Sequence, residues 1–149
     1  DASVLVVAPG ASSELRERLA SPNLAFAEGG VNLRLAAQEA SLGVLWSGGG
    51  NTALAFLLAG KPVVILPNQI EPFLQGLRVQ QMGAGLVADL DTAQEALPVL
   101  LARALTDSNV RDRAAEFAMR YRGASGEQQL QKMAVRLEQL SALSPAGKR

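Results

Sequence analysis

A short glycine-rich segment, Ser47-Gly-Gly-Gly-Asn-Thr52, is the part of the sequence best suited to chemistry. It lies between an apolar run that predicts a strand and another that predicts a helix. Glycines let the backbone turn sharply and approach a ligand without a Cβ in the way. The helix that follows begins with unpaired N–H groups and the positive end of its dipole, which together attract an anion. We therefore predict a diphosphate-binding turn made of Ser47, Gly48, Gly49, Gly50, Asn51 and Thr52.

The glycine run has a simpler interpretation, a tight strand-to-helix turn without a ligand, because glycines are common in turns. The missing residue types narrow the chemistry further. The sequence has no His and no Cys, which excludes disulfides, thiol nucleophiles, the usual zinc ligand sets and a histidine base. The sequence therefore assigns no catalytic residue, and we expect neither a metal site nor a cofactor.

The elements that must position this segment alternate along the first ninety residues. Apolar runs of strand length occur at 4–8, 23–27, 44–46, 63–66 and 86–88. Helical patterns separate them at 12–19, from the Gly29-Gly30 break to about 41, at 51–59 and at 73–82. Continuous apolar strands spaced by helices are typical of a parallel sheet covered on both faces. We predict an α/β fold, a Rossmann-like doubly wound parallel sheet followed by C-terminal helices.

The strands stop after Asp89, and helices are predicted at 93–105, 109–122 and 127–143. The last helix carries an apolar stripe at three- and four-residue steps, Leu130, Met133, Leu137 and Leu140. The stripe must be buried, either on this domain or against another one. Residues 144–149 are expected to be a frayed tail.

Composition bounds the class of protein. The 149 residues suit one domain, and 48% hydrophobic with 19% charged residues excludes a disordered chain. Lys and Arg together number 14, as do Asp and Glu together, so the net charge is zero. A protein that binds nucleic acid normally has a surplus of basic residues. No apolar stretch approaches the roughly 20 residues that span a bilayer, and no signal-peptide pattern opens the chain. We expect a cytoplasmic protein that binds no nucleic acid.

The glycine-rich segment belongs to a longer pattern. Gly48, Gly49 and Thr52 are followed at characteristic spacing by Gly60, Pro62, Pro67, Gly83 and Gly85. From residue 3 to about 90, the chain resembles the C-terminal, nucleotide-sugar donor-binding domain of GT-B glycosyltransferases. It is similar to the UDP-sugar transferases and to the peptidoglycan N-acetylglucosaminyltransferase family.

The resemblance implies that residues 1–149 are one donor-binding domain that starts one strand and helix late. It implies a UDP- or dTDP-linked hexose donor. It also implies a partner, the N-terminal acceptor-binding domain or subunit, and any contact with a membrane would be made through that partner only. Glu71 and Gln75 would orient the sugar, and Val31 lies where the family holds the nucleotide base. The diphosphate would be held at the helix N-terminus without a metal.

Six residues, at four places in the sequence, depart from the family pattern. Ser47 stands where His is frequent, and Ala55 replaces the Glu that grips the ribose. Glu71-Pro72 replaces Asp-Gln, and Gln75-Gly76 replaces Asn-Ala. An alternative is therefore a degenerate, non-catalytic GT-B-like binding or interaction domain. A third is a relative of the nucleotide-sugar 2-epimerases, although residues 51–56 contain no carboxylate to abstract a proton.

Overall fold

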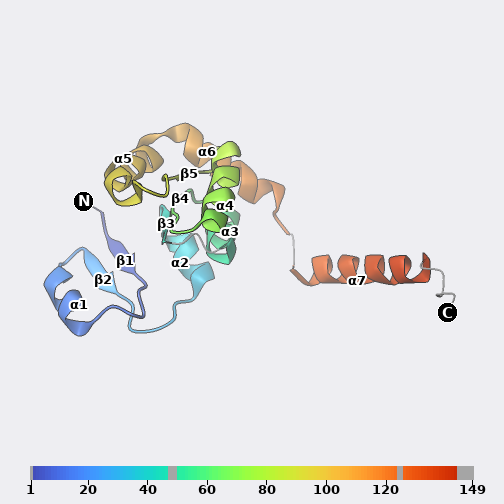
Figure 1. The fold of residues 1–149 in the computed structure, drawn as a ribbon, viewed down its shortest axis with the longest axis horizontal. Coiled ribbons are helices and arrows are strands. Elements are labelled where there is room, and N and C mark those ends of the chain that lie inside the picture. The colour runs from blue at the N-terminus through green and yellow to red at the C-terminus, as the bar shows by residue number, and fades with distance from the viewer. Residues whose placement is uncertain (1, 47–49, 124–125, 144–149) are drawn as a thin grey trace.

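The structure is a computed structural model that describes residues 2–46, 50–123 and 126–143 (Figure 1). The elements alternate as predicted through β5, and helices follow. The strands are β1 (Val4–Val6), β2 (Leu24–Phe26), β3 (Gly43–Trp46), β4 (Val63–Leu66) and β5 (Gly85–Val87). The helices are α1 (Ser13–Leu19), α2 (Leu33–Glu39), α3 (Gly50–Leu58), α4 (Ile70–Gln81), α5 (Ala93–Thr106), α6 (Ser108–Arg120) and α7 (Gly126–Leu143). The predicted α/β class is confirmed.

Capping side chains set the start of two helices. The Ser12 hydroxyl accepts a hydrogen bond from the Leu15 N–H at 3.2 Å, so α1 begins at Ser13. The Asn32 side chain accepts from the Leu35 N–H at 3.1 Å, and α2 therefore begins later than the Gly29-Gly30 break suggested. Helix α4 begins three residues before the predicted start at Phe73, because Pro72 is tolerated in a first turn, where no intrahelical N–H bond is lost.

All strand pairings are parallel, but the strands form two sheets. In the larger sheet the order is β3-β4-β5, with Gly43 opposite Val63 and Val63 opposite Gly85. In the smaller sheet β1 pairs with β2, with Val4 opposite Leu24. The predicted parallel strands are present, but in the described residues no ladder joins β1 to β3, so the strands are divided between two sheets.

The central strand β4 divides the core into two layers. Val63 and Ile65 point to the side covered by α2, α3 and α4, in a cluster with Ala37, Ala53, Phe56, Leu57 and Val79. Val64 and Leu66 point to the opposite side, with Leu86, Ala88, and Ala104 and Val110 from α5 and α6. Because α5 packs on β4 and β5, these two strands are covered on both faces.

Strand β3 is covered on one face only. Gly43 and Leu45 are buried against the α2–α3 side, whereas Val44 and Trp46 are 46% and 59% exposed. By register, Val44 and Trp46 lie on the same face as Val64 and Leu66. The prediction that the sheet is covered on both faces is therefore wrong at β3, because α5 does not extend over it.

Helix α7 lies apart from the other elements (Figure 1). The four side chains of its apolar stripe are exposed, from 48% at Leu140 to 69% at Leu130. The stripe is therefore not buried on this domain, which was one of the two places predicted for it.

Arg16 ties the β1–α1–β2 unit together. Its guanidinium group donates hydrogen bonds to the carbonyl oxygens of Ala8, Ala11 and Ala27, each at 3.1 Å. It also lies 5.4 Å from the centroid of the Phe26 ring. One cation thus links the chain just after β1 to the chain just after β2.

We expect Arg16→Met to destabilise the β1–α1–β2 unit by about 2 kcal/mol, since bonds from a charged donor are lost and carbonyls are left unpaired. Faster amide exchange in β1 and β2, with β4 unchanged, would show this. Arg18→Met is the matched control, because Arg18 is exposed in the same helix. Equal effects of the two substitutions would contradict the assignment.

Candidate nucleotide site

The carboxyl end of β3 and the start of α3 frame the candidate site. Strand β3 ends at Trp46 and α3 begins at Gly50, so the helix N-terminus lies at the carboxyl edge of the sheet. Ligands of open α/β sheets bind at this edge, where helix N-termini point at them. The predicted residues Ser47, Gly48 and Gly49 lie outside the described residues.

Helix α4 brings two further predicted residues to this point. A Cβ built on Gly50 would lie 3.3 Å from the Gln75 Oε1 atom. The Gln75 Nε2 atom donates a hydrogen bond to the Glu71 Oε1 atom at 3.3 Å. Gly50, Gln75 and Glu71 are thus neighbours, although more than 20 residues separate Gly50 from Glu71 in the sequence. This group places amide and carboxylate oxygens beside the α3 N-terminus.

The remaining predicted residues are less closely tied to this group. Asn51 is exposed and Thr52 is half-buried in the first turn of α3. Neither side chain makes a hydrogen bond within the described part of the chain, so both can bond a ligand. Val31 is half-buried in the segment before Asn32, and no hydrogen bond connects it to Gly50, Glu71 or Gln75 among the described residues. Its role at a base stays a prediction.

Packing accounts for three of the departures from the family pattern. Ala55 packs against the buried cluster on the α3 side of the sheet. Pro72 is buried in the first turn of α4. At Gly76, an added Cβ would lie 2.5 Å from the Val87 Cγ2 atom, so only glycine lets α4 approach β5 this closely. The sequence showed only that these positions differ, because burial at each of them depends on the tertiary structure.

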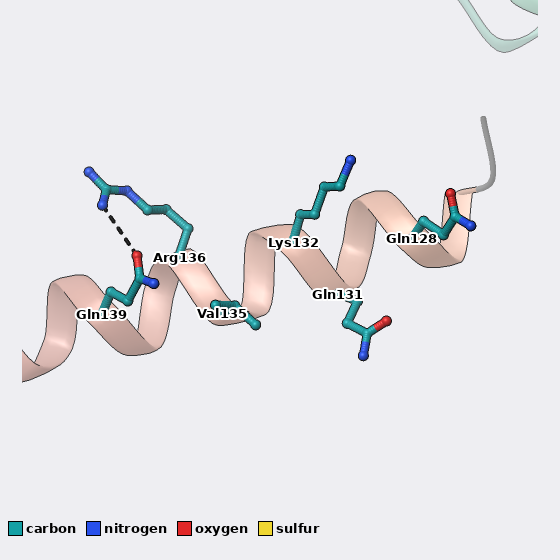
Figure 2. Close-up of a pocket in the computed structure, with 6 residues that line it drawn as sticks. All are labelled: Gln128, Gln131, Lys132, Val135, Arg136 and Gln139. Atoms are coloured by element: carbon teal, nitrogen blue, oxygen red, sulfur yellow. Dashed lines mark hydrogen bonds between the residues drawn. The ribbon is translucent and has the colours of Figure 1, made fainter.

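Neither a second ligand pocket nor a metal site is found in the described part of the chain. The hollow shown in Figure 2 is lined by Gln128, Gln131, Lys132, Val135, Arg136 and Gln139, all from α7. A single helix supplies its walls, so the hollow encloses no ligand by itself. Among the described residues, no three acidic side chains gather into a group that could hold a metal ion, and no helix is long and apolar enough to cross a membrane.

Comparison with solved structures identifies the fold. The spinosyn forosaminyltransferase SpnP superposes with a TM-score of 0.70 at 23% identity, over 95% of this chain and 35% of its own. The glycosyltransferase VinC, solved in complex with dTDP, gives 0.73 at 22% identity over 91% and 34%. SnogD, a glycosyltransferase from Streptomyces nogalater, gives 0.71 at 20% identity over 92% and 35%.

The chain therefore has the Rossmann-like fold of a GT-B glycosyltransferase half, as the sequence resemblance predicted. It spans about a third of the length of these proteins. No protein-family model matches the sequence, and no curated protein matches it.

We expect Gly76→Ala to destabilise the chain by about 1–3 kcal/mol, the usual result of overpacking. The sign of the change in unfolding free energy is informative, because Gly→Ala inside a helix otherwise stabilises a protein by about 0.5–1 kcal/mol. Urea unfolding measures the difference. Gly126→Ala is the helical control, since a Cβ there meets nothing within 4 Å. A Gly76→Ala variant as stable as the parent would mean that α4 does not pack this closely on β5.

Proposed function

We propose that residues 1–149 are the donor-binding half of a glycosyltransferase that transfers a hexose from a UDP- or dTDP-linked sugar. The observation that carries this proposal is the meeting of the α3 N-terminus with Glu71 and Gln75 at the carboxyl edge of the sheet. The likeness to several glycosyltransferases, one of them holding dTDP, supports it. The acceptor site and the general base would belong to an N-terminal domain or subunit outside these residues.

The proposed chemistry assigns the diphosphate to the glycine-rich segment. N–H groups of Gly49, Gly50 and Asn51 and the Thr52 hydroxyl would bond the phosphate oxygens, with Ser47 and Gly48 completing the turn. When the bond from the sugar to the diphosphate breaks, the leaving group gains negative charge, which the α3 dipole stabilises without a metal. The acceptor oxygen attacks the same sugar carbon and loses its proton to a base in the other half.

The sugar would be oriented from α4. The Glu71 carboxylate can accept hydrogen bonds from two sugar hydroxyls, and Gln75 can donate or accept one. In the structure the two side chains already bond each other, so they present a joint polar surface. Val31 would border the nucleotide base.

A second function is a degenerate GT-B-like module that contributes a binding surface and no donor site. Ala55 and Pro72 favour it, because both positions carry packing side chains where the family pattern has polar ones. Nucleotide titration separates the two functions. Absence of heat or chemical-shift change at millimolar UDP and dTDP would favour the degenerate module.

We expect Gly49→Val to abolish nucleotide binding while the sheet stays folded, because a side chain there would obstruct the approach of the diphosphate. Calorimetric titration with UDP and dTDP measures affinity, and circular dichroism checks the fold. Gly10→Val is the control, since a Cβ at Gly10 meets nothing within 4 Å. Unchanged affinity in folded Gly49→Val would mean that the segment is only a turn.

Glu71→Gln should weaken binding of the nucleotide sugar by about 1–3 kcal/mol, the usual range for a lost bond to a charged group. Binding of the free nucleotide should hardly change, because the proposal gives the carboxylate a bond to the sugar and none to the nucleotide. Comparing dTDP with a dTDP-hexose, and UDP with a UDP-hexose, measures the difference. Glu95→Gln on α5 is the control for the lost charge. Equal losses for nucleotide and nucleotide sugar would place Glu71 elsewhere.

A further inference from the structure

The side chain of Gln75 lies between the start of α3 and the Glu71 carboxylate. Its Oε1 atom lies 3.3 Å from a Cβ built on Gly50, the first residue of α3. Its Nε2 atom donates a hydrogen bond to the Glu71 Oε1 atom at 3.3 Å. The oxygen end of this amide therefore faces the helix N-terminus, and the nitrogen end faces the carboxylate.

Elementary electrostatics accounts for this orientation of the amide. The start of a helix carries a partial positive charge, which attracts the amide oxygen. A carboxylate accepts hydrogen bonds and donates none, so it bonds the amide nitrogen. Glu71 and Gln75 are four residues apart on α4, the spacing at which helical side chains are neighbours. The observed orientation is thus the one that a positive helix terminus and a negative side chain favour together.

A single hydrogen bond holds the Gln75 amide among the described residues. Its Oε1 atom accepts none there, and its Nε2 bond ends on a side chain. Gln80 on the same helix differs, because its Oε1 atom accepts a hydrogen bond from the Val87 N–H of β5 at 3.2 Å. The last side-chain torsion of a glutamine is broad, so rotation about it exchanges oxygen and nitrogen with little other movement. The Gln75 amide can therefore turn over, whereas turning Gln80 breaks a bond to the backbone.

An anion at the start of α3 reverses the preference of the Gln75 amide. Diphosphate oxygens are negative acceptors, so they repel Oε1 and bond the Nε2 protons. Once the amide has turned, Oε1 faces the Glu71 carboxylate, and two acceptors cannot bond each other. The carboxylate is then free to accept hydrogen bonds from sugar hydroxyls. The bond lost to one anion is replaced by a bond to another, so the exchange leaves no donor unpaired.

We propose that Gln75 is a positioning residue that couples the two parts of the donor site. A diphosphate at the start of α3 turns the Gln75 amide toward itself, and this turn frees Glu71 to bond the sugar. The inference rests on the proposed function and deepens it, because the diphosphate end of the donor prepares the place for its sugar end. Linkage is reciprocal, so a sugar bonded to Glu71 also favours the turned amide and hence the diphosphate.

Nuclear magnetic resonance of residues 1–149 tests the turn directly. Without ligand, the Nε2 protons of Gln75 should give a strong Overhauser contact with the Glu71 side chain and a weak one with the Gly50 α-protons. Saturation with dTDP or UDP should reverse these intensities and shift the Gln75 side-chain amide signal, which is identified by its loss in Gln75→Leu. The Gln80 amide signal is the internal control and should not shift. Thymidine and uridine, which carry no phosphate, should leave both signals unchanged.

Substitutions at Gln75 test the consequence for affinity. Gln75→Leu removes the donor that would bond the diphosphate, so affinity for dTDP and UDP should fall about 10-fold, as for one lost bond to a charged group. Gln75→Glu leaves only oxygens at this point and should lower affinity at least as much. Gln81→Glu is the matched control, because Gln81 is exposed on the same helix, and it should change neither affinity. Circular dichroism checks that each variant is folded.

Three results would overturn the coupling and leave the proposed function standing. The first is a strong contact between the Gln75 Nε2 protons and Gly50 before any ligand is added, which would mean that the amide already faces α3. The second is binding of dTDP or UDP, seen as heat and as shifts at Gly50 and Asn51, with the Gln75 contacts unchanged. The third is unchanged nucleotide affinity in both Gln75 variants. Absence of binding by both nucleotides, in contrast, would reject the proposed function and the coupling with it.

Discussion

The complete burial of β4 is the constraint on which the rest of the structure depends. Val63, Val64 and Ile65 have no exposed surface, so apolar partners must reach this strand from both faces. Helices α2 to α4 supply one layer and α5 supplies the other, while α6 contributes Ala114 to the first and Val110 to the second. Burying a side chain of this size contributes about 1.5–3 kcal/mol. Parallel strands with helices on both faces are the usual way to obtain such a strand.

The candidate site is a consequence of this layering. Helices α3 and α4 pack on the same face of the sheet, and α3 begins just beyond the carboxyl end of β3. Because Gly76 has no side chain, α4 packs closely on β5, and the neighbouring residue Gln75 lies next to Gly50. Glu71 and Gln75, which we propose to orient the sugar, thus lie beside the start of α3 because two helices pack on the same apolar surface. The fold is that of a GT-B half.

The sheet is well packed at one end and open at the other. Strands β4 and β5 have helices on both sides, whereas β3 has them on one side and β1 has exposed apolar residues along its length. The stripe on α7 is exposed as well. Apolar surface left open at the edge of a sheet is ordinarily covered in the working protein, because unpaired edges promote aggregation. The exposed face of β3 ends at Trp46, directly before the glycine-rich segment in the sequence.

The sequence by itself determined the kinds of elements and their order. The run Val63-Val-Ile-Leu66 predicts a buried strand because an unbroken apolar run suits burial on both faces. Ser12 is a local start signal that works within one turn of helix. The glycine-rich segment after Trp46 indicated where to look for a ligand site, and the comparisons confirmed the predicted fold. Only the tertiary structure decided that the strands form two sheets and that Gln75 lies next to Gly50. It also decided that glycine is needed at position 76 against Val87, and that Val44 and the α7 stripe are exposed. The physical reason is that a residue's pattern records its preference for burial, whereas burial itself requires a partner from a distant part of the chain, or from outside it.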